Sequence, residues 1–490
     1  MWKLLLVCLG LLLPFSSGKV KIVSNELEAQ KPIQLTEGTF DSEIRRVPAS
    51  SGLMVEFYAH WCPTCQAFQP AYEEVAAYFH TEPKVQPEVW VARVDCATEV
   101  KLCNRFHVTK YPTMRFGHGP DFEDGSKQEM AELSGKKSAE EVVKWLSQQL
   151  NTHYDYGTNQ VVPHLVENST DVTSVKSQNA TAGKAGLKDI ESASRLAWKY
   201  MMDSGDLLRG LEARQAFLDF MELMSTGHPI PSCKEGSSSI FQKANELWPA
   251  DERAEPLPDL AKLSVCGQGE AKEEWDECKG SQPGRRGYTC GLWMLLHSLA
   301  ANALPEHSGG AFWMTAVRGF IQHFFQCSAC ANHFVTMTEQ PDAESVTTRR
   351  DAVLWMWKAH NQVNARLERQ EEDGKDGDPA FPKQQWPPAD LCPLCHLPSS
   401  QSANPSWNED KTYRFLLKFY SQPSTSKGLI DLVPQKTAKQ LSDISHGIKK
   451  SAGPHANRAL FVLVLGLAAA AVVACIRTRR APGRRSKSIL

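Results

Sequence analysis

The sequence predicts a multidomain fold, in which an α/β domain is followed by all-α helical-bundle domains and a single C-terminal transmembrane helix. Three observations support this prediction. Strand-like apolar runs and helical periodicity both occur within residues 19–150, helical patterns dominate residues 187–421, and an uncharged apolar run occupies residues 459–476. Because strands and helices repeat every two and every 3.6 residues, the change of period marks the change of fold class.

The two ends of the chain carry apolar segments that indicate the secretory pathway. Residues 1–18 combine a basic start, an apolar run and small residues, which is typical of a signal peptide. The run 459–476 rises about 1.5 Å per residue and would cross a thin bilayer. The basic tail 477–490 follows it and predicts a cytosolic end, hence a single-pass type I membrane protein. A missing retention signal favours the Golgi or the cell surface, and proteolysis could release a secreted form.

Cysteine count and charge narrow the classes of function. Of the 14 cysteines, Cys8 and Cys475 lie in the apolar end segments, and the remainder is even, as a fully paired lumenal protein requires. Asn168 and Asn179 begin glycosylation sequons within the polar segment 151–186. This segment is predicted to be a flexible linker, with a passive spacer as the alternative. The net charge of −2 gives no electrostatic argument for nucleic acid.

The α/β domain, residues 19–150, places a cysteine pair between a strand and a helix. The apolar run 52–59 precedes Cys62-Pro63-Thr64-Cys65, after which apolar residues recur at helical spacing. The free amides and the dipole of a helix start would stabilise a thiolate at Cys62. The pair can therefore cycle between dithiol and disulfide with little backbone movement.

The rest of this domain continues the alternation of strands and helices. Residues 88–94 read as a strand, and Tyr111-Pro112-Thr113 precedes another. Ser138 and Glu141 form a capping box that begins a closing helix. Cys96 and Cys103 lie close in sequence and are predicted to form a structural disulfide.

Residues 187–270 are predicted to form a redox-inert helical domain. Apolar residues recur at helical spacing from Asp189 to Thr226, and the segment contains no CxxC pair. Cys233 and Cys266 are left over by every local pairing, so we expect them to bridge. After residue 421, a juxtamembrane linker is expected at 422–458.

The last predicted helical domain, residues 271–421, carries four motifs. They are RGYTCGLWMLLHSL at 286–299, CSACANHF at 327–334, WKAHNQVNARL at 357–367, and FPKQQWPP at 381–388 followed by CPLC at 392–395. Histidines and aromatic residues recur four apart on predicted helix faces, which is more often a packed core than a cofactor site. Two of the motifs contain further CxxC pairs, Cys327/Cys330 and Cys392/Cys395.

Two metal-based readings of these pairs stay open from the residues alone. Cys327, Cys330 and His333, with Cys392, Cys395 and His396, could ligate zinc. Cys392-Pro393-Leu394-Cys395-His396 also fits the attachment pattern of a c-type haem. No axial-ligand pattern accompanies it, and the prediction is that the chain holds no metal.

The first domain resembles a thioredoxin-like domain of the protein disulfide isomerase type, on the motifs VEFYAHWCPTC and YPT. The resemblance implies that Cys62 is the exposed nucleophile, Cys65 the resolving thiol and Pro112 a cis-proline beside them. It also implies that Glu56 is a buried acid that assists proton transfer, although a satisfied strand carboxylate is the alternative. His60 stands where such isomerases usually carry proline, so the redox poise is open.

The four helical motifs resemble the Erv-type FAD-binding sulfhydryl oxidase domain. Together with one thioredoxin-like domain, they resemble the quiescin sulfhydryl oxidase family in its plant and protist layout, with 187–270 as a degenerate oxidase-like domain. The resemblance implies FAD as cofactor, a bridge between Cys278 and Cys290, and an accessory or structural role for Cys392 and Cys395. The residues expected to line the FAD site are Arg286, Trp293, His297, His333, Trp357, His360, Asn361, Val363, Asn364, Lys383 and Trp386.

The mechanism that follows from the resemblance is a relay of electrons. Substrate thiols reduce Cys62/Cys65, which reduce Cys327/Cys330, with Cys330 next to FAD, and O2 becomes H2O2. The expected substrates are thiols of reduced or unfolded secretory proteins and small dithiols, and the chain is expected to be monomeric. The alternatives are a disulfide isomerase or reductase that needs no flavin, and a zinc-stabilised lumenal interaction protein.

Overall fold

The computed structural model describes part of the chain. The described residues are 30–81, 89–123, 125, 130–135, 137–154, 156, 185–203, 205–251, 258–303, 305–372, 377–397 and 406–421. All of them belong to one compact unit, Met1–Gln422. The predicted signal peptide 1–18, Asn168 and Asn179, and everything from residue 422 onward lie outside the described residues.

A five-stranded mixed sheet forms the centre of the α/β part. The strand order is β1-β3-β2-β4-β5; β1, β3 and β2 run parallel, and β4 and β5 are antiparallel to their neighbours. Val55 of β2 lies opposite Ala92 of β3 and Arg115 of β4. The strands are β1 (Ile33–Leu35), β2 (Gly52–Tyr58), β3 (Val89–Asp95), β4 (Thr113–Gly117) and β5 (Ala131–Glu132).

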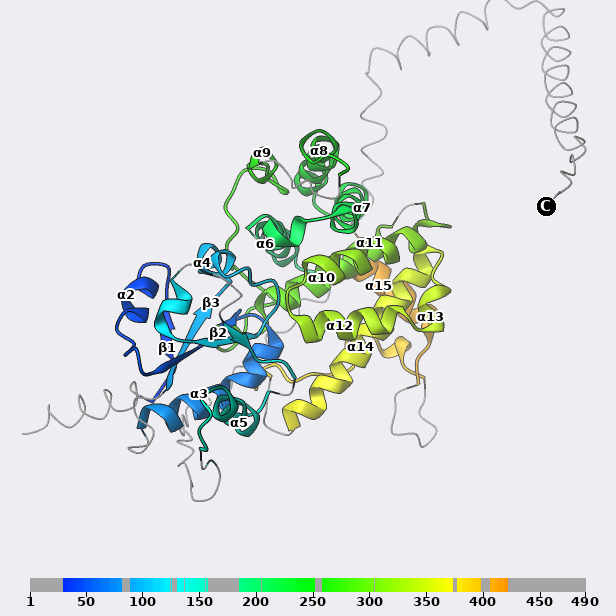
Figure 1. Cartoon of the computed structure of the whole chain (residues 1–490). Coiled ribbons are helices and arrows are strands. Elements are labelled where there is room, and N and C mark those ends of the chain that lie inside the picture. The colour runs from blue at the N-terminus through cyan, green and yellow to red at the C-terminus, as the bar shows by residue number, and fades with distance from the viewer. Residues whose placement is uncertain are drawn as a thin grey trace, which may run out of the picture. The chain divides into compact units, whose positions relative to one another are not determined.

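Helices cover both faces of this sheet (Figure 1). Because side chains alternate along β2, Val55 and Phe57 join the core under α2 and α4, whereas Met54 joins the core under α3 and α5. The last helix begins where Ser138 Oγ accepts a hydrogen bond from the Glu141 backbone amide at 3.3 Å. The helices are α2 (Phe40–Ile44), α3 (Pro63–Thr81), α4 (Val100–Arg105), the 3₁₀ turn η1 (Gly119–Phe122) and α5 (Ala139–Gln149).

From residue 185 onward, the described chain is helical. Here α6 packs on α10, α7 on α8 and α11, and α14 on α10 and α11. The elements are α6 (Leu187–Asp203), η2 (Gly205–Leu208), α7 (Leu211–Gly227), α8 (Pro231–Leu247), α9 (Pro258–Ala261), α10 (Gly287–Ala301), α11 (Gly309–Phe324), α12 (Ser328–Thr338), α13 (Pro341–Glu344), α14 (Arg349–Glu372), η3 (Pro393–Cys395) and α15 (Glu409–Tyr420). The predicted order, an α/β part followed by helical parts, is confirmed.

The helical pattern read from Asp189 to Thr226 is interrupted in the structure. A short 3₁₀ turn separates α6 from α7, and Gly210 at the start of α7 has a φ of +89°. Glycine tolerates this left-handed conformation, and apolar periodicity alone does not reveal such a break. The interruption lets α7 turn back to pack against α11, where Phe220 stacks on Phe320 at 4.1 Å.

The transmembrane part of the predicted fold class needs correction. Among the residues that the structure describes, none of the helices combines the length and the apolar character needed to cross a membrane. The run 459–476, on which the prediction was based, lies outside the described residues. Apolar composition over a run of residues was the whole basis of that prediction, and it does not by itself establish a helix.

Candidate functional site

The first CxxC pair lies where β2 gives way to α3. Cys62 immediately precedes α3, and Cys65 lies in its first turn. Both are free thiols, and both are buried. The expectation that Cys62 is exposed is therefore wrong for this arrangement, in which the helical part covers it. The Tyr111–Pro112 peptide bond, just before β4, is cis. The reactive end of this pair is therefore formed by a helix start, the position that favours a thiolate.

Glu56 is buried in β2, on the sheet face that α3 covers. Burial raises its pKa to about 8, and the opposing charge of Arg93 only partly offsets this. Burial also raises the pKa of the Cys65 thiol well above its ordinary value, and the neighbouring Cys62 and Glu56 add to the rise. Glu56 Oε1 has no hydrogen-bond partner in the described structure. A carboxyl group that titrates near neutral pH, close to a thiol that holds its proton tightly, is suited to proton transfer.

The second CxxC pair also lies at a helix start. Cys327 caps the N-terminus of α12, and a disulfide joins it to Cys330 in the first turn. Cys327 is fully buried. The structure therefore holds one pair reduced and the other oxidised.

The two pairs face each other. Thr64, between the first two cysteines, places its Oγ1 3.5 Å from Cys327 Sγ and 3.9 Å from Cys330 Sγ. The Tyr111 backbone amide donates to the Gln326 carbonyl at 2.8 Å, and Ser328 Oγ donates to the Tyr111 carbonyl at 3.2 Å. Segments more than 200 residues apart are thus held together by backbone contacts beside both sulfur pairs.

An aromatic contact extends this junction. Trp61, next to Cys62, is almost fully buried and stacks on Phe325 at 5.7 Å. It also meets Tyr288 edge-on at 5.0 Å and lies 5.5 Å from Tyr200. Burying a tryptophan side chain among aromatic rings contributes strongly to the stability of a contact between two parts of a protein. Trp61 therefore packs into the helical part, next to the Cys62/Cys65 pair.

Several of the residues predicted to line a cofactor site form one stacked cluster. Trp293 lies parallel to His360 at 4.0 Å, and His297 lies parallel to Tyr420 at 4.6 Å. His297 Nε2 and His360 Nδ1 share a hydrogen bond of 3.0 Å. Burial lowers the pKa of His297 well below its ordinary value, and burial together with Lys383 lowers that of His360 to about 3. Both imidazoles are therefore neutral.

Asn361 and Trp357 have a positioning role in the structure. Asn361 Nδ2 donates to the Trp386 carbonyl and Asn361 Oδ1 accepts from the Trp386 amide, both at 2.8 Å. Trp357 Nε1 donates to the same carbonyl at 2.5 Å. One turn later, Asn364 Nδ2 donates to the Gln384 carbonyl at 2.9 Å. These bonds fasten the segment that carries Trp386 to α14.

Cations border the cluster. Lys383 pairs with Glu371 at 3.2 Å, and its charge contributes to the lowered pKa of His360. Burial lowers the pKa of His333, and the charge of Arg366 lowers it further. Arg286 lies over the Phe381 ring at 4.1 Å. Flat neutral rings beside cations are the donor set that an aromatic cofactor with a phosphate bridge requires, so the residues present fit FAD.

The remaining predicted residues lie as follows. Val363 is buried on α14, and His333 is half-buried on α12. Cys392 and Cys395 are joined by a disulfide around η3, where His396 Nε2 donates to the Pro387 carbonyl at 2.9 Å. Disulfides also join three further pairs, Cys96–Cys103, Cys233–Cys266 and Cys278–Cys290.

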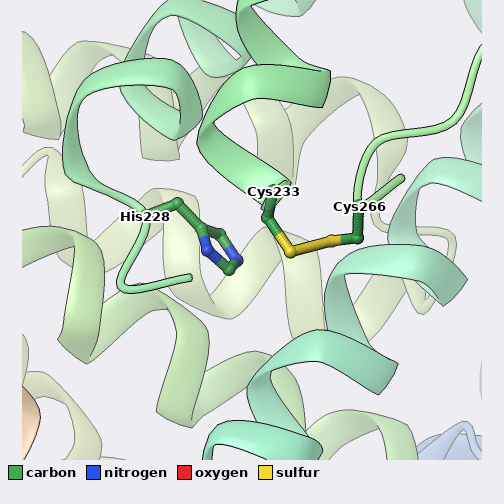
Figure 2. Close-up of side chains that lie close together, drawn as sticks. All are labelled: His228, Cys233 and Cys266. Carbon is green, nitrogen blue, oxygen red and sulfur yellow. A yellow bond between two sulfur atoms is a disulfide. The ribbon is translucent and has the colours of Figure 1, made fainter. Parts of the chain in front are cut away.

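One cluster resembles a metal site by proximity alone. His228, Cys233 and Cys266 place their ligand atoms within 4.8 Å of one another (Figure 2). The two sulfurs are bonded to each other, and His228 Nδ1 accepts the Ile230 amide at 3.0 Å. The other nitrogen lies 2.9 Å from Ser194 Oγ, whose hydroxyl donates to the Ile190 carbonyl. With both nitrogens and both sulfurs occupied, this cluster is a structural core.

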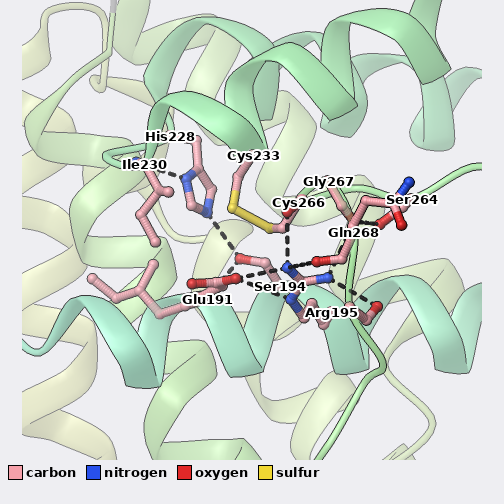
Figure 3. The surroundings of a disulfide bond; sticks show 12 residues. Glu191, Ser194, Arg195, His228, Ile230, Cys233, Ser264, Cys266, Gly267 and Gln268 are labelled. Atoms are coloured by element: carbon pink, nitrogen blue, oxygen red, sulfur yellow. Dashed lines mark hydrogen bonds and ion pairs between the residues drawn. A yellow bond between two sulfur atoms is a disulfide. The ribbon is translucent and has the colours of Figure 1, made fainter.

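Arg195 fastens the loop that carries Cys266. Its guanidinium donates to the Cys266 carbonyl at 2.8 Å and pairs with Glu191 at 2.7 Å (Figure 3). It also donates to the Gly269 carbonyl at 3.1 Å. The disulfide and this arginine together secure the loop to α6 and α8.

Sequence reasoning did not identify Thr64, Tyr420 or Tyr111 as contributors to the site. Tyr420 ends α15 and stacks on His297, and it lies beyond the four motifs. The helical periodicity of 409–420 could have suggested a packing face but not its target. Thr64 and Tyr111 lay inside quoted motifs, but their contacts are with residues far along the chain.

Comparisons with known proteins fall on these same segments. The Erv1 / Alr family matches residues 290–387, and the thioredoxin family matches residues 31–148. Sulfhydryl oxidase 1 of Arabidopsis thaliana is 33% identical over 433 residues, which cover 84% of this chain and 78% of that protein.

A second relative and one solved structure are also similar to this chain. Sulfhydryl oxidase 2 of Arabidopsis thaliana is 32% identical over 438 residues, covering 85% of each chain. A solved structure, the sulfhydryl oxidase fragment of human QSOX1, is 29% identical, with a TM-score of 0.41. It covers 49% of this chain and 97% of that one.

Proposed function

The chain belongs to the quiescin sulfhydryl oxidase family, and from this premise we propose how its own residues carry out thiol oxidation. It is a thiol oxidase that introduces disulfides. The proposal concerns which sulfurs act, which residues hold the cofactor, and which thiols are oxidised. One observation carries it: the reduced Cys62/Cys65 pair faces the oxidised Cys327–Cys330 pair across Thr64.

The relay begins at the first pair in its oxidised form. A substrate thiolate attacks Cys62, and Cys65 leaves as a thiolate. A second substrate thiolate then attacks the substrate sulfur bonded to Cys62, so the substrate gains a disulfide and Cys62/Cys65 gain two electrons. Cys62 leaves as a thiolate in that second attack.

Thiol–disulfide exchange between the two CxxC pairs then moves the electrons from Cys62/Cys65 to the helical part. The Cys62 thiolate attacks Cys327, a Cys62–Cys327 bond forms, and the Cys327–Cys330 bond breaks, leaving Cys330 as a thiolate. Cys65 then attacks Cys62, restores the Cys62–Cys65 disulfide and releases Cys327 as a thiolate. Cys65 must lose its proton for this step, and Glu56, with a pKa of about 8, is placed to take it.

We propose that FAD is held by the stacked cluster and the cations around it. The rings of Trp293, His297, His360, Trp386 and Tyr420 would contact its planar parts, and Lys383, Arg286 and Arg366 would face its phosphates. FAD, when bound, would supply the two-electron chemistry that oxidises the Cys327/Cys330 thiolates back to their disulfide and passes the two electrons to O2, which is released as H2O2. The residues themselves supply orientation and exclude water from the sulfur pairs.

The substrates we propose are reduced or unfolded secretory proteins and small dithiols. A signal peptide at 1–18, glycosylation at Asn168 and Asn179, and residence in the Golgi or at the cell surface belong to the same proposal, as does a monomeric state. The sequence pattern at those positions supports the signal peptide and the glycosylation sites, and the five disulfides of the described chain support an oxidising compartment.

The test is the visible spectrum of the purified full-length chain before and after anaerobic addition of a dithiol. We expect a flavin band that bleaches on addition and recovers in air with release of peroxide. A well-folded protein that stays colourless after expression with ample FAD would contradict the proposal. It would leave a disulfide isomerase or reductase centred on Cys62 and Cys65.

A further inference from the structure

A histidine bridges the two parts of the chain next to the reactive thiols. His60 lies two residues before Cys62, and its Nδ1 is 2.7 Å from Asp95 Oδ2 on the same side of the junction. Its Nε2 is 2.9 Å from Glu273 Oε1 and 3.0 Å from Glu273 Oε2, which belong to the helical part. Because both ring nitrogens face carboxylates, both carry protons and the ring is cationic.

The charge on His60 follows from this geometry. Burial by itself would lower the pKa of the imidazole, but the hydrogen bonds to Asp95 and Glu273 outweigh burial and raise it to about 10. Glu273 is itself held, since the Tyr200 hydroxyl donates to it at 3.2 Å. Asp95 also accepts from the Ala97 amide at 3.1 Å. The three groups therefore form a fixed, charge-assisted chain across the junction.

A neighbouring side chain fixes the backbone of His60 to the same partner. Gln66 Nε2 donates to the carbonyls of His60 at 2.5 Å and Gly284 at 2.6 Å, and Arg285 donates to Gln66 Oε1 at 3.2 Å. With Trp61 inserted among Tyr200, Tyr288 and Phe325, the residues on both sides of Cys62 are engaged by the helical part.

We propose that the His60 imidazolium, held between Asp95 and Glu273, is a positioning latch that keeps the Cys62/Cys65 pair against Cys327–Cys330 while electrons cross. The proposal rests on the function proposed above and names a residue that acts through its neighbours. Asp95 aims the ring, and Glu273 supplies the contact that exists only when the two parts are together.

Such a latch must also release. Cys62 is 0% exposed in the docked arrangement, so it must leave this arrangement to meet a protein substrate. The side chains of His60 and Glu273 are 26% and 37% exposed, and solvent weakens ion pairs of this kind. The His60–Glu273 contact has a defined direction but is weakened by solvent. These two properties suit a junction that opens and closes in every catalytic cycle.

The test uses the Cys65→Ser variant of the full-length chain, in which the exchange stops at the mixed disulfide. The Cys62 thiolate attacks Cys327, the Cys327–Cys330 bond breaks, and Cys330 is left as a thiol that alkylation after acid quench captures. Mass spectrometry then measures the fraction of chains that carry the Cys62–Cys327 bond. This readout does not depend on turnover or on the cofactor.

Four variants are compared in that background: two single variants, their combination and a matched control. Glu273→Gln removes the charge across the junction and leaves the His60–Asp95 pair intact, and we expect it to lower the mixed-disulfide fraction by about three- to tenfold. His60→Gln should lower it by a similar factor, and the double variant should lose no more than either single variant. Glu274→Gln is the matched control, because Glu274 is the next residue and pairs with Lys188 at 3.9 Å.

The outcomes separate the latch from the relay. Equal fractions of mixed disulfide with and without Glu273→Gln would overturn the latch, as would an equal loss in the Glu274→Gln control. Losses that simply add in the double variant would mean that the two residues act separately, and would also overturn it. If no mixed disulfide forms even in Cys65→Ser alone, the transfer route itself is wrong. If His60→Gln fails to fold, the Glu273→Gln result decides.

Discussion

Two cysteine pairs of the helical part share the CxxC spacing but lie in different local structures. Cys327 and Cys330 begin an α-helix, α12, and they face Thr64 of the α/β part. Cys392 and Cys395 surround a single 3₁₀ turn, η3. Around them, the Asn408 amide donates to the Cys395 carbonyl at 2.8 Å, and His396 pairs with Trp407 in an isolated bridge.

The difference shows that CxxC spacing permits redox exchange without determining it. A helix start supplies free amides and a positive dipole end, and a facing dithiol supplies the electrons. Only the Cys327–Cys330 pair has both in the described structure. The Cys392–Cys395 pair instead ties the segment after Trp386 to the start of α15, whose last residue, Tyr420, stacks on His297. We therefore infer that its work is structural.

The largest effect should come from breaking the acceptor pair. Cys330→Ser should lower turnover at least about a thousandfold on protein thiols and small dithiols alike, because both routes end at this sulfur. Oxygen consumption measures the loss, and absorbance shows that flavin remains bound. Substantial turnover in this variant would contradict the assignment and would move attention to Cys392–Cys395.

The next largest effect should separate two kinds of substrate. Cys62→Ser should lower oxidation of a reduced unfolded protein by about a hundredfold or more, since the relay loses its first sulfur. A small dithiol that reaches Cys327 directly should still be oxidised slowly, at a rate within a few fold of the parent chain. Full-rate oxidation of the protein substrate by Cys62→Ser would show that the relay does not begin at this residue.

Much of this arrangement could be predicted from local sequence. The apolar run before Cys62, the helical spacing after Cys65 and the Ser138 cap depend on neighbouring residues. They predicted β2 and the starts of α3 and α5 to within a residue or two. The aromatic and histidine positions at 293, 297 and 360 were found through motifs, and the structure brings them together, with Trp293 stacked on His360 and His297 tilted against both. Periodicity works here because each element buries one face of its own.

Other features depend on contacts that no local pattern encodes. Thr64 contacts Cys327, and His60 contacts Glu273, and each pair is separated by more than 200 residues. The sequence around each residue therefore contains no pattern that predicts its partner. The break before Gly210 arises from one left-handed glycine inside a continuous apolar pattern. The transmembrane prediction had a different weakness. It relied on the apolar composition of residues 459–476, with no contact to other residues to support it.

A third prediction concerns Glu56, which lies near the Cys62/Cys65 pair that donates electrons to Cys327–Cys330. Glu56 has a pKa of about 8 in the folded chain against an ordinary value of 4.5, so folding binds a proton between these values. Stability should therefore fall as pH rises from about 4.5 toward 8, and Glu56→Gln should remove that fall. At pH 8 the variant should be more stable than the parent by a few (~2–4) kcal/mol. Thermal unfolding at pH 5 and pH 8 measures the difference.

Glu56→Gln should also slow the relay, because Cys65 loses the group that takes its proton. We expect about a tenfold loss of turnover on protein thiols. Glu140→Gln, at an exposed position on α5, is the control and should change neither quantity. A variant that gains stability at pH 8 yet keeps full turnover would leave Glu56 as a buried carboxylate without a role in proton transfer.

The smallest effect on turnover should come from the third pair. Replacing Cys392 and Cys395 together with serine leaves the Thr64-facing disulfide untouched, so turnover on protein thiols should stay within about threefold of the parent chain. The loss should appear in stability instead, at about 2 kcal/mol for a loop this short. Unfolding by denaturant and retention of flavin after dilution measure it, since α15 and Tyr420 are secured through this segment. A large loss of turnover with unchanged stability and full flavin content would show that Cys392 and Cys395 carry electrons, and the contrast between the two pairs would then lie in their order along one route.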